Sequence, residues 1–339
     1  MFQNSIVGRR PIFALAAAAL LLLPHIASAE TKTVRIAKQF GLGYLPLTIM
    51  EQKQLLEAQG KKLGLDLKTE WIQFTGGPPM NDAILSGSLD FASGGVGPLL
   101  TIWGKTRGSI GVKGVAALNS MPLYLNTTNP DVKTIKDFTE KDRIALPAVR
   151  VSIQAITLQM AAEKVFGVGQ EHKLDDLTVS LGHPDGMAAM MGGRSEINSH
   201  FTSAPFQDQE LKDKRVHKVL DSYEVLGGPH TFNVVWATNK FYTENPKVMQ
   251  AFVAALDEAM KEIAADPAAA AALWIKAENS KISVAEAERI IRLPENEWTL
   301  VPKKIMFYAD YMVRAGMIPS KPVTWQDVFF PEAHGLPGS

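Results

Sequence analysis

The sequence has no cysteine, and other missing patterns exclude several classes of protein. Without cysteine there are no disulfides, no thiolate metal ligands and no N-terminal cysteine for a lipid anchor. The seven histidines never occur at the H-x-x-H, H-x-x-x-H or H-E-x-x-H spacing of zinc sites. A G-x-S-x-G nucleophile elbow is also missing, and Gly41-Leu42-Gly43 lacks the third glycine of a dinucleotide-binding fingerprint. We therefore expect no metal, no cofactor and no enzyme activity.

The sequence also has no excess of charge of either sign. Lys and Arg together number 35, and so do Asp and Glu, which gives a formal net charge of zero. Arg9 and Arg10 fall in the leader described next, so the mature chain would carry a formal charge of about −2. A nucleic-acid-binding domain normally presents a basic face. We therefore expect no nucleic acid partner.

Long apolar runs are missing outside residues 1–29, which have the pattern of a secretory signal peptide. Arg9 and Arg10 give a basic start, residues 12–23 an apolar core, and Ala27-Ser28-Ala29 an A-x-A cleavage site before Glu30. The apolar core is shorter than the roughly 20 residues of a membrane span. The arginine pair leaves both Sec and twin-arginine export open. Without a lipid anchor, the exported chain is predicted to lie in the periplasm.

What the sequence does have is a pair of glycine-rich turns that follow strand-like segments. Residues 71–74 and 89–92 have the composition of strands, and residues 75–79 (TGGPP) and 93–98 (SGGVGP) break them before helix-like segments. In a parallel α/β sheet such turns lie at the carboxyl ends of the strands, where ligands bind. The free N–H groups at the helix starts favour anions or carbonyl oxygens there.

The rest of the chain alternates strand-like and helix-like segments, as α/β folds do. Further strands are predicted at residues 33–37, 65–74, 114–119, 123–126, 143–147, 177–181, 216–223 and 231–238. Further helices are predicted at residues 47–59, 135–138, 153–166, 187–191, 246–265, from Pro267 to about Lys276, 285–292 and 302–315. Ser152 is expected to cap helix 153–166, and Gly60 is expected to lie just past helix 47–59.

Residues 83–98 resemble residues 189–205. Each segment has a short apolar helix, a glycine, an acidic residue, a strand and a turn. One interpretation is coincidence, because βα units look alike. The other is a pair of lobes of the same topology that face each other, which would place His200 and Thr202 opposite Gly94 and Val96.

Three segments resemble the sulfonate/nitrate/taurine group of periplasmic solute-binding proteins, which serve ABC importers. They are residues 33–57 (TVRIAKQFGLGYLPLTIMEQKQLLE), residues 74–100 (FTGGPPMNDAILSGSLDFASGGVGPLL) and residues 235–252 (VWATNKFYTENPKVMQAF). The resemblance implies a two-lobed type II periplasmic binding-protein fold of the α/β class, in which helices flank a mixed sheet in each lobe and one ligand lies in the cleft.

The same resemblance implies domain boundaries. Lobe 1 would comprise residues 30–120 plus 226–339, and lobe 2 residues 121–225. Relatives often have a Gly-Ser-Thr type helix start where this chain has Ala148-Val149-Arg150-Val151-Ser152. The resemblance therefore implies the fold but not the identity of the ligand.

The predicted ligand-binding residues lie at glycine turns, at helix starts and at the presumed hinge. They are Gln39, Tyr44, Thr75, Gly76, Ser93, Gly94, Gly95, Val96, Asn119, Arg150, Ser152, His200 and Thr202. Several have an alternative structural role: the glycines in turn geometry, Tyr44 in the core, Arg150 at the surface or between lobes, and His200 as a structural histidine. We interpret His183-Pro184-Asp185 as a turn rather than a metal site.

Three functions follow from these patterns. The first is capture of a small anion (sulfonate, nitrate or carboxylate) by a monomer that closes about a hinge and delivers the ligand to an inner-membrane ABC permease. The second is the same role for a neutral aromatic or pyrimidine-type ligand held by Phe40, Tyr44 and Phe201. The third is an enzyme on this scaffold, because pyrimidine-precursor synthases of thiamin biosynthesis and a menaquinone-pathway dehydratase resemble this fold. Those synthases look to need a cysteine-rich iron-binding motif and work in the cytosol, whereas this chain has no cysteine and a predicted export signal.

Overall fold

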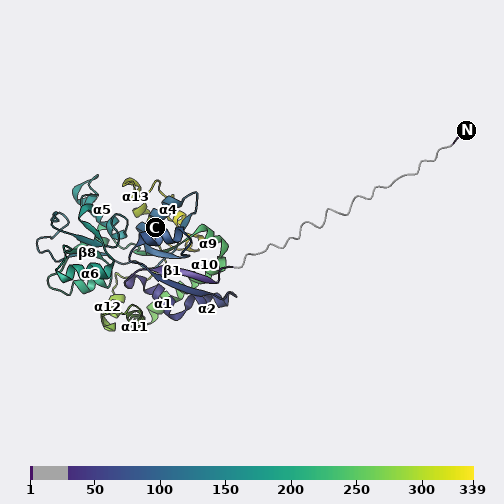
Figure 1. Cartoon of the computed structure of the whole chain (residues 1–339), viewed down its shortest axis with the longest axis horizontal. Coiled ribbons are helices and arrows are strands. Elements are labelled where there is room, and N and C mark those ends of the chain that lie inside the picture. The colour runs from purple at the N-terminus through teal and green to yellow at the C-terminus, as the bar shows by residue number, and fades with distance from the viewer. Residues whose placement is uncertain (3–29) are drawn as a thin grey trace.

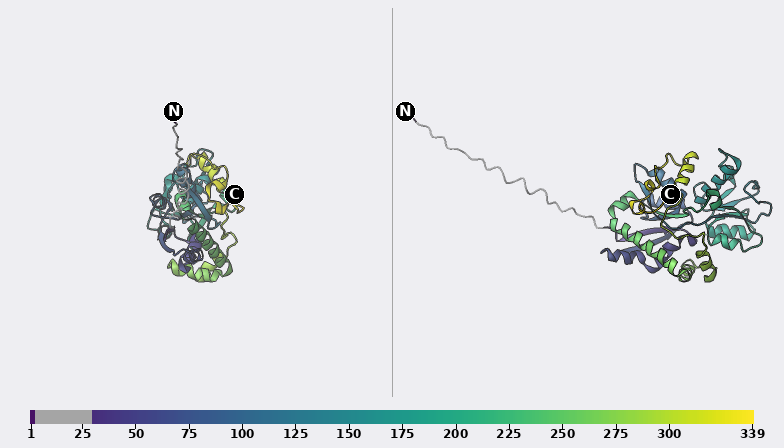
Figure 2. Two further views of the ribbon diagram at one scale, coloured as in Figure 1. Left: turned by 90° about the vertical axis from the view of Figure 1, so that its right-hand side faces the viewer. Right: turned by 180° about the vertical axis from the view of Figure 1, so that it is seen from behind.

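The structure is a computed structural model that describes residues 1–2 and 30–339. The predicted signal peptide therefore lies outside the described residues, apart from its first two. The described chain forms two lobes that lie side by side, one carrying β8, α5 and α6 and the other carrying β1, α1 and α10 (Figure 1). Figure 2 shows the same division from behind. None of the helices in residues 30–339 is long and apolar enough to cross a bilayer.

Lobe 2, as we use the name here, is built on a five-stranded mixed sheet. All its strands come from residues 124–221, in the order β7-β6-β8-β5-β9. β6 pairs in parallel with β7 and β8, whereas β5 pairs antiparallel with β8 and β9. The strands are β5 (Tyr124–Thr127), β6 (Ile144–Leu146), β7 (Thr178–Ser180), β8 (Ser199–Thr202) and β9 (His217–Asp221). The helices are α5 (Ile153–Phe166), η2 (Asp175–Leu177), α6 (His183–Gly192), α7 (Phe206–Glu210) and α8 (Ser222–Leu226).

Lobe 1 carries a three-stranded sheet and a parallel pair of strands. In the sheet, β10 (Asn233–Thr238) lies between β3 (Ala92–Gly95) and β4 (Val112–Ala117) and pairs antiparallel with both. The pair is β1 (Thr33–Lys38) with β2 (Lys68–Gln73). A parallel bridge between Ile36 and Phe91 connects β1 to the segment that leads into β3. Strands from residues 33–117 and from residues 233–238 thus build one lobe.

Helices surround these strands. They are η1 (Leu42–Tyr44), α1 (Leu45–Lys53), α2 (Leu55–Lys62), α3 (Gly77–Leu85), α4 (Val96–Thr106), α9 (Asn239–Glu244), α10 (Pro246–Ala265), α11 (Pro267–Ala277), α12 (Val284–Ile291), α13 (Ile305–Arg314), η3 (Trp325–Val328) and η4 (Pro331–Ala333). The longest, α10, begins at a proline, whose fixed φ suits the first helical turn. Its apolar side, which includes Phe252 and Leu256, is fully buried and packs against α1 and α2.

Two crossover segments connect the lobes and pair with each other. Ser120 and Thr231 form an antiparallel bridge, and Ser120 Oγ donates a hydrogen bond to the His230 carbonyl at 2.8 Å. Asn119 Nδ2 donates to the Gly43 carbonyl at 2.6 Å, which fixes the crossover to the turn after β1. The crossover therefore holds the position of a loop in lobe 1 that faces lobe 2.

The predicted α/β class with helix-flanked sheets is confirmed, and several predicted elements match the structure. Helices 153–166 and 246–265 have the predicted bounds as α5 and α10, and Ser152 Oγ caps α5 by accepting from Ala155 N at 3.2 Å. These segments carry both a cap signal and a stop signal, so local sequence determined both ends.

Other predictions were wrong. Residues 93–95 and 199–202, predicted as turns, are the strands β3 and β8. Buried neighbours override the low strand propensity of glycine, since Gly94 pairs with Val234 and lies against the Trp236 ring. Helix 47–59 is two helices divided at Gln54, whose φ is 53°. Gly60 lies inside α2, and residues 135–138 form a turn.

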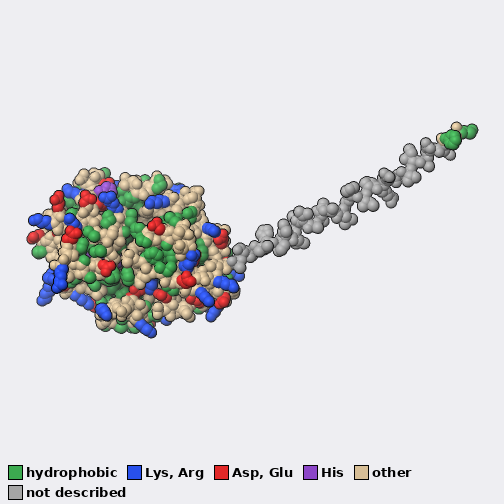
Figure 3. All heavy atoms as spheres, in the orientation of Figure 1, with side chains coloured by type: hydrophobic (Ala, Val, Ile, Leu, Met, Phe, Trp, Pro, Cys, Tyr) green, Lys and Arg blue, Asp and Glu red, His purple; other side chains and the backbone are tan. Residues whose placement is uncertain are grey.

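The hydrophobic core is continuous between the lobes. One cluster of buried side chains contains Val96 and Leu99 of α4 together with Ile153 and Ile156 of α5. On the face drawn in Figure 3, hydrophobic and uncharged side chains occupy much of the middle, and charged ones lie mostly towards the edge. The two lobes are thus in close contact in this structure.

Candidate functional site

A small pocket lies between the two lobes. It encloses about 340 Å³ of space not occupied by atoms, open solvent included. Lobe 1 contributes backbone and neutral side chains, and lobe 2 contributes the end of β6 and the starts of two helices. The lining residues are Gln39, Tyr44, Gly77, Gly95, Pro98 and Phe232 from lobe 1, and Pro147, Ser152, Ile153, Gln154 and His183 from lobe 2.

Four helix starts converge on this pocket. Gly77 is the first residue of α3, Gly95 precedes α4, Ser152 precedes α5, and His183 is the first residue of α6. The first N–H groups of a helix have no partner within it and carry partial positive charge. No side chain caps α3, α4 or α6 in the described structure. Pro78 and Pro79 of α3, Pro98 of α4 and Pro184 of α6 have no N–H. The remaining N–H groups of these helix starts suit an anion or another hydrogen-bond acceptor.

Glycines allow the lobes to approach each other at the pocket. A Cβ placed on Gly95 would lie 2.7 Å from the Cβ of Ile153, and one on Gly76 would lie 2.8 Å from the Pro147 carbonyl oxygen. Neither glycine has a positive φ, so close approach rather than backbone conformation accounts for the missing side chain. The Leu42 N–H donates to the Ala204 carbonyl at 3.0 Å, which joins the lobes directly.

On the lobe 1 side, two polar side chains line the pocket beside the turn after β1. Gln39 Nε2 donates to the Ser93 carbonyl at 3.3 Å, which leaves its Oε1 without a recorded partner in the described structure. The Tyr44 hydroxyl donates to Asn233 Oδ1 at 3.3 Å, and burial raises the pKa of this phenol, so it stays protonated. The Asn233 Nδ2 group is buried, with no partner in the described residues. This side of the pocket thus offers neutral groups only.

On the lobe 2 side, polar side chains continue inward from the pocket. Gln154 Nε2 lies 3.4 Å from His183 Nε2, and His183 Nδ1 lies 3.3 Å from His200 Nε2. His200 Nδ1 lies 2.6 Å from Glu210 Oε1, and both side chains are fully buried. Thr202 Oγ1 lies 3.1 Å from His183 Nδ1. Burial and the neighbouring His200 hold the pKa of His183 well below its ordinary value, so His183 is neutral.

None of the described lining residues carries a formal charge. Lys38, next to Gln39 in the chain, pairs with Glu51 at 2.8 Å and Glu278 at 3.0 Å. Arg150 pairs with Asp175 at 3.4 Å. Any charge on a ligand would have to be stabilised by N–H groups and dipoles rather than by a lysine or arginine.

The structure brings some of the predicted residues together at this pocket. Four of them line it: Gln39, Tyr44, Gly95 and Ser152. Five others adjoin or support it: Gly76 and Val96 at the starts of α3 and α4, Thr75 against Gly182, and His200 and Thr202 behind His183.

The remaining four predicted residues lie outside the lining. Ser93 Oγ donates to the Ala37 carbonyl at 2.6 Å, and Gly94 lies within the β3–β10 pairing. Asn119 is committed to the crossover through its bond to Gly43. The Arg150 side chain is 64% exposed and faces Asp175. The φ of Arg150 is 65°, so the backbone is left-handed at this residue, three positions before α5 begins.

Sequence reasoning missed His183, Gln154, Pro147 and Phe232. We interpreted His183 as part of a turn, whereas it is the first residue of α6 and 7% exposed, towards the pocket. Glycine before His183 and proline after it are a helix-start signal that would have pointed to the correct boundary. Gln154 and Phe232 have no such signal, because only the packing of the lobes brings them to the pocket.

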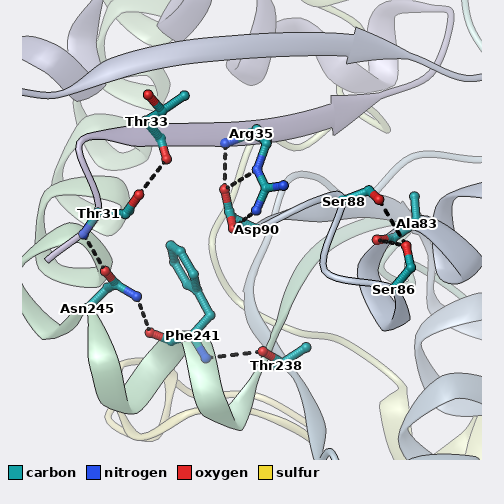
Figure 4. A network of polar contacts seen from close by, with 10 residues as sticks. All are labelled: Thr31, Thr33, Arg35, Ala83, Ser86, Ser88, Asp90, Thr238, Phe241 and Asn245. Carbon is teal, nitrogen blue, oxygen red and sulfur yellow. Dashed lines mark hydrogen bonds and ion pairs between the residues drawn. The ribbon is translucent and has the colours of Figure 1, made fainter.

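A larger hollow of about 830 Å³ lies on lobe 1 alone, away from the cleft. Several of the polar groups that line it pair with one another (Figure 4). Arg35 makes two side-chain hydrogen bonds to Asp90, at 3.0 and 2.8 Å, and Asn245 accepts from Thr31 N at 2.8 Å. Despite its smaller volume, we regard the interlobe pocket as the candidate site, because helix starts from both lobes meet there.

Solved structures with the same fold include several periplasmic proteins. The alkanesulfonate-binding protein SsuA from Xanthomonas axonopodis pv. citri, bound to MOPS, is 18% identical, with a TM-score of 0.70 over 89% of this chain and 99% of that one. The aliphatic sulphonate-binding protein SsuA from Escherichia coli is 19% identical, with a TM-score of 0.64 over 88% and 98%.

The nitrate-binding protein NrtA from Synechocystis PCC 6803 is 15% identical, with a TM-score of 0.69 over 88% of this chain and 85% of that one. At such identities these structures establish the fold, which is that of periplasmic binding proteins. Among curated proteins, no sequence matches the chain. The model of the NMT1-like family matches residues 27–276, which is well over half of the sequence. The chain therefore belongs to the NMT1-like family.

Proposed function

We propose that this protein is the periplasmic solute-binding component of an ABC importer and that it captures a small anion between its lobes. The observation that carries the proposal is the convergence of four helix starts on one interlobe pocket. Unpaired N–H groups at helix starts bind anions without a full countercharge. Sulfonate, nitrate and carboxylate are the classes we favour, and the proteins of similar fold that bind a sulfonate or nitrate support this choice.

Ligand capture would involve movement of the lobes about the crossover. We keep the boundaries proposed from the sequence, with residues 30–120 plus 226–339 as lobe 1 and residues 121–225 as lobe 2. The separate sheets and the paired crossover segments support this division. A ligand that contacts both lobes favours the closed arrangement by its differential affinity for that state. The closed form of a monomer would then dock on an inner-membrane permease.

A neutral aromatic or pyrimidine-type ligand is a less suitable occupant. Phe201, one of the three aromatic residues suggested for it, is fully buried within the core. Tyr44 and Phe232 do line the pocket, but helix starts contribute much of the rest of its lining. An enzyme on this scaffold has no supporting observation in the described residues.

Isothermal titration of the mature chain, residues 30–339, tests the proposal. The probes are nitrate, methanesulfonate and acetate, with pyrimidine and phenol as neutral controls. Sulfonate buffers must be avoided, because a protein of this fold was solved bound to MOPS. Bis-Tris and Tris, which are cationic, are suitable. We expect saturable binding of at least one anion, and binding of the neutral compounds alone would overturn the anion proposal.

Two further measurements separate capture from other roles. Mass spectrometry of protein purified from the periplasm would identify a ligand that co-purifies with it. Small-angle scattering would show a decrease in the radius of gyration when the ligand is added to ligand-free protein, as hinge closure requires. A chain that binds an anion without any change in shape would contradict the closing mechanism but not the binding role.

A further inference from the structure

Four charged side chains join the two lobes at a second place, outside the pocket lining. Asp208 in α7 and Lys212 just after it belong to lobe 2, and Glu286 and Arg289 on α12 belong to lobe 1. Lys212 Nζ lies 3.1 Å from Glu286 Oε1, and Arg289 Nη2 lies 3.3 Å from Asp208 Oδ1. Each lobe thus provides one acid and one base, and both pairs cross between the lobes. We call these four residues the latch.

The helices that carry the latch are each fixed to their own lobe. Ala287, Ile290 and Ile291 bury the apolar side of α12 in a cluster that also contains residues of α1 and α10. In lobe 2, α7 packs against β5 and α6. A movement that separates the lobes would therefore separate α7 from α12 and break both pairs of the latch.

The two carboxylates of the latch are buried to a similar degree but are compensated unequally. The side chains of Asp208 and Glu286 are 12% and 15% exposed. Glu286 Oε1 has two cationic partners, Lys212 and, at 3.0 Å, Arg289. Asp208 has only Arg289, and its Oδ2 is buried with no partner in residues 30–339. Asp208 has therefore lost hydration that the protein does not replace, which is costly for an ionised group.

The pKa values of the two carboxylates reflect this inequality. The hydrogen bond from Arg289 holds the pKa of Glu286 below its ordinary value, and Lys212 adds to this effect. Burial raises the pKa of Asp208 to about 6, although Arg289 acts in the opposite direction. The pair that crosses from Lys212 thus stabilises ionised Glu286, whereas ionised Asp208 is less stable here than in water.

We propose that the latch controls closure of the lobes: Lys212 and Glu286 hold them together, and the Asp208 carboxylate resists closure until it takes up a proton. The inference rests on the proposed function, since it takes opening and closing of the lobes as the motion that admits the ligand. Separation of the lobes would return water to Asp208, so the open form binds this proton less tightly than the closed form. Acid therefore favours the closed form and raises anion affinity.

The size of the effect follows from proton linkage between the two forms. An open form in which Asp208 has its ordinary pKa of 3.8 is almost fully ionised at pH 5. In the closed form, a pKa of about 6 leaves most of Asp208 protonated at pH 5 and little of it at pH 7. Anion affinity should then rise by up to about tenfold from pH 7 to pH 5. Nitrate and methanesulfonate stay ionised over this range, so the linked proton belongs to the protein.

Other titratable groups lie on α7, on α12 and on the elements around them. They are Glu210 on α7, which pairs with His200 on β8, Tyr124 on β5, His183 and Asp185 on α6, and Glu288 on α12, which pairs with Arg292. Burial raises the pKa of Tyr124 and lowers that of His183, so both stay neutral. A D208N variant retains all of these groups and therefore isolates the contribution of Asp208.

Calorimetric titration with nitrate and with methanesulfonate at pH 7 and pH 5 tests the role of Asp208. Piperazine, a cationic buffer, adds no competing anion of its own. The natural mature chain should bind more tightly at pH 5, a comparison that needs no variant. D208N keeps the shape of the side chain without its charge. It should bind about fivefold or more tightly than the natural chain at pH 7 and change less than about twofold between the two pH values.

Lys212→Gln tests the part of the latch that holds the lobes together. It removes the cation that reaches Glu286 from lobe 2, and it should weaken anion binding about two- to fivefold at both pH values. Lys261→Gln is the matched control, because it also breaks a pair between a lysine and a carboxylate. That pair joins Lys261 to Asp257 at 2.5 Å and lies within α10. The control should bind anions as the natural chain does.

Each part of the inference can fail by itself. An affinity that does not rise from pH 7 to pH 5 in the natural chain, or a rise that persists in D208N, would overturn the role of Asp208. Equal affinities in Lys212→Gln and Lys261→Gln would overturn the holding role of Lys212 and Glu286. These results leave the proposed function intact, because an anion still binds. If no anion binds to any of these proteins at either pH, the proposed function fails as well.

Discussion

The two faces of the cleft use different chemistry. The lobe 1 face combines the neutral side chains of Gln39, Tyr44 and Phe232 with glycines at two helix starts, Gly77 and Gly95, that no side chain caps. The lobe 2 face presents the capped start of α5 and polar side chains that extend inward to Glu210. Close approach of the lobes needs glycine where their backbones meet, whereas selection of a ligand needs side chains held in one orientation. We therefore propose that the glycines of lobe 1 limit how closely the lobes approach and that the side chains of lobe 2 select the ligand.

The largest expected effect comes from adding a single methyl group to the lobe 1 face. Gly95→Ala keeps an allowed backbone conformation, since φ is −67°, but its Cβ would lie 2.7 Å from the Cβ of Ile153 in this structure. Ile153 is β-branched at that atom and cannot move aside by rotation. Overpacking of this kind costs about 1–3 kcal/mol, so anion affinity should fall about ten- to a hundredfold.

Titration calorimetry and scattering check this prediction. The methyl group should hold the lobes apart, so the ligand-induced decrease in the radius of gyration should be smaller in Gly95→Ala. Gly192→Ala is the control, because a Cβ there meets nothing within 4 Å and its φ is not positive. If Gly95→Ala binds as tightly as the control, the lobe 1 face does not limit closure.

The second prediction concerns a buried histidine that lies outside the cleft. His230 sits at the crossover, with Nε2 2.8 Å from Ser222 Oγ and Nδ1 3.0 Å from the Thr231 carbonyl oxygen. Burial lowers the pKa of His230 to about 4, against an ordinary value of 6.5. The unfolded chain therefore binds this proton more readily. Stability should be fully present above pH 6.5 and fall as the pH drops towards 4, by about 2 kcal/mol at pH 5.

Urea unfolding of the natural chain and of His230→Gln at pH 7 and pH 5 measures this contribution. The free energy of unfolding should fall by about 2 kcal/mol less in the variant between the two pH values, whatever its stability at pH 7. The test compares how much the free energy of unfolding changes between pH 7 and pH 5 in each protein. A general loss of packing in the variant lowers both values equally and does not affect this difference. If the free energy of unfolding changes equally with pH in both proteins, His230 does not take up a proton on unfolding in this range.

A third prediction tests the contrast between the capped and uncapped helix starts. Ser152→Ala removes the oxygen that accepts from Ala155 N at 3.2 Å. Loss of such a cap costs about 1 kcal/mol, and Ser152→Gly should cost only a few tenths, since glycine is tolerated at this position. The free energy of unfolding in urea measures both. If alanine and glycine cost the same, the hydroxyl does not stabilise α5 as a cap.

Much of the fold could be predicted from local sequence, and the failures have identifiable causes. α5 and α10 had both a start and a stop signal, so their bounds were found. β3 and β8 were predicted as turns because glycine and serine have low strand propensity. In the structure these strands are buried beside apolar partners, and tertiary pairing decides their conformation. The break at Gln54 had no glycine or proline to announce it.

For the site, the sequence indicated the glycine turns and Ser152 but not the buried polar side chains that lie behind the lobe 2 face. His200 was predicted to contact the ligand, yet it does not line the pocket. His183 lines the pocket instead, and His200 lies behind His183. The two are 17 residues apart in the chain and meet only because α6 packs on β8. No sequence pattern indicated that Glu210 lies near the site. The buried contacts from His183 through His200 to Glu210 depend on tertiary neighbours, which one sequence does not specify.

The smallest expected effect concerns the one arginine that the sequence offered as an anion ligand. Arg150 is 64% exposed and its Nε lies 3.4 Å from Asp175 Oδ2. Exposed ion pairs contribute little to stability because solvent screens them. To reach the pocket, the guanidinium would have to leave Asp175 and its aqueous surroundings. Arg150→Ala should therefore change anion affinity less than about twofold in calorimetry at low ionic strength. A tenfold loss that salt reduces would show instead that Arg150 acts on the anion at long range, and the lobe 2 face would then select by charge as well as by orientation.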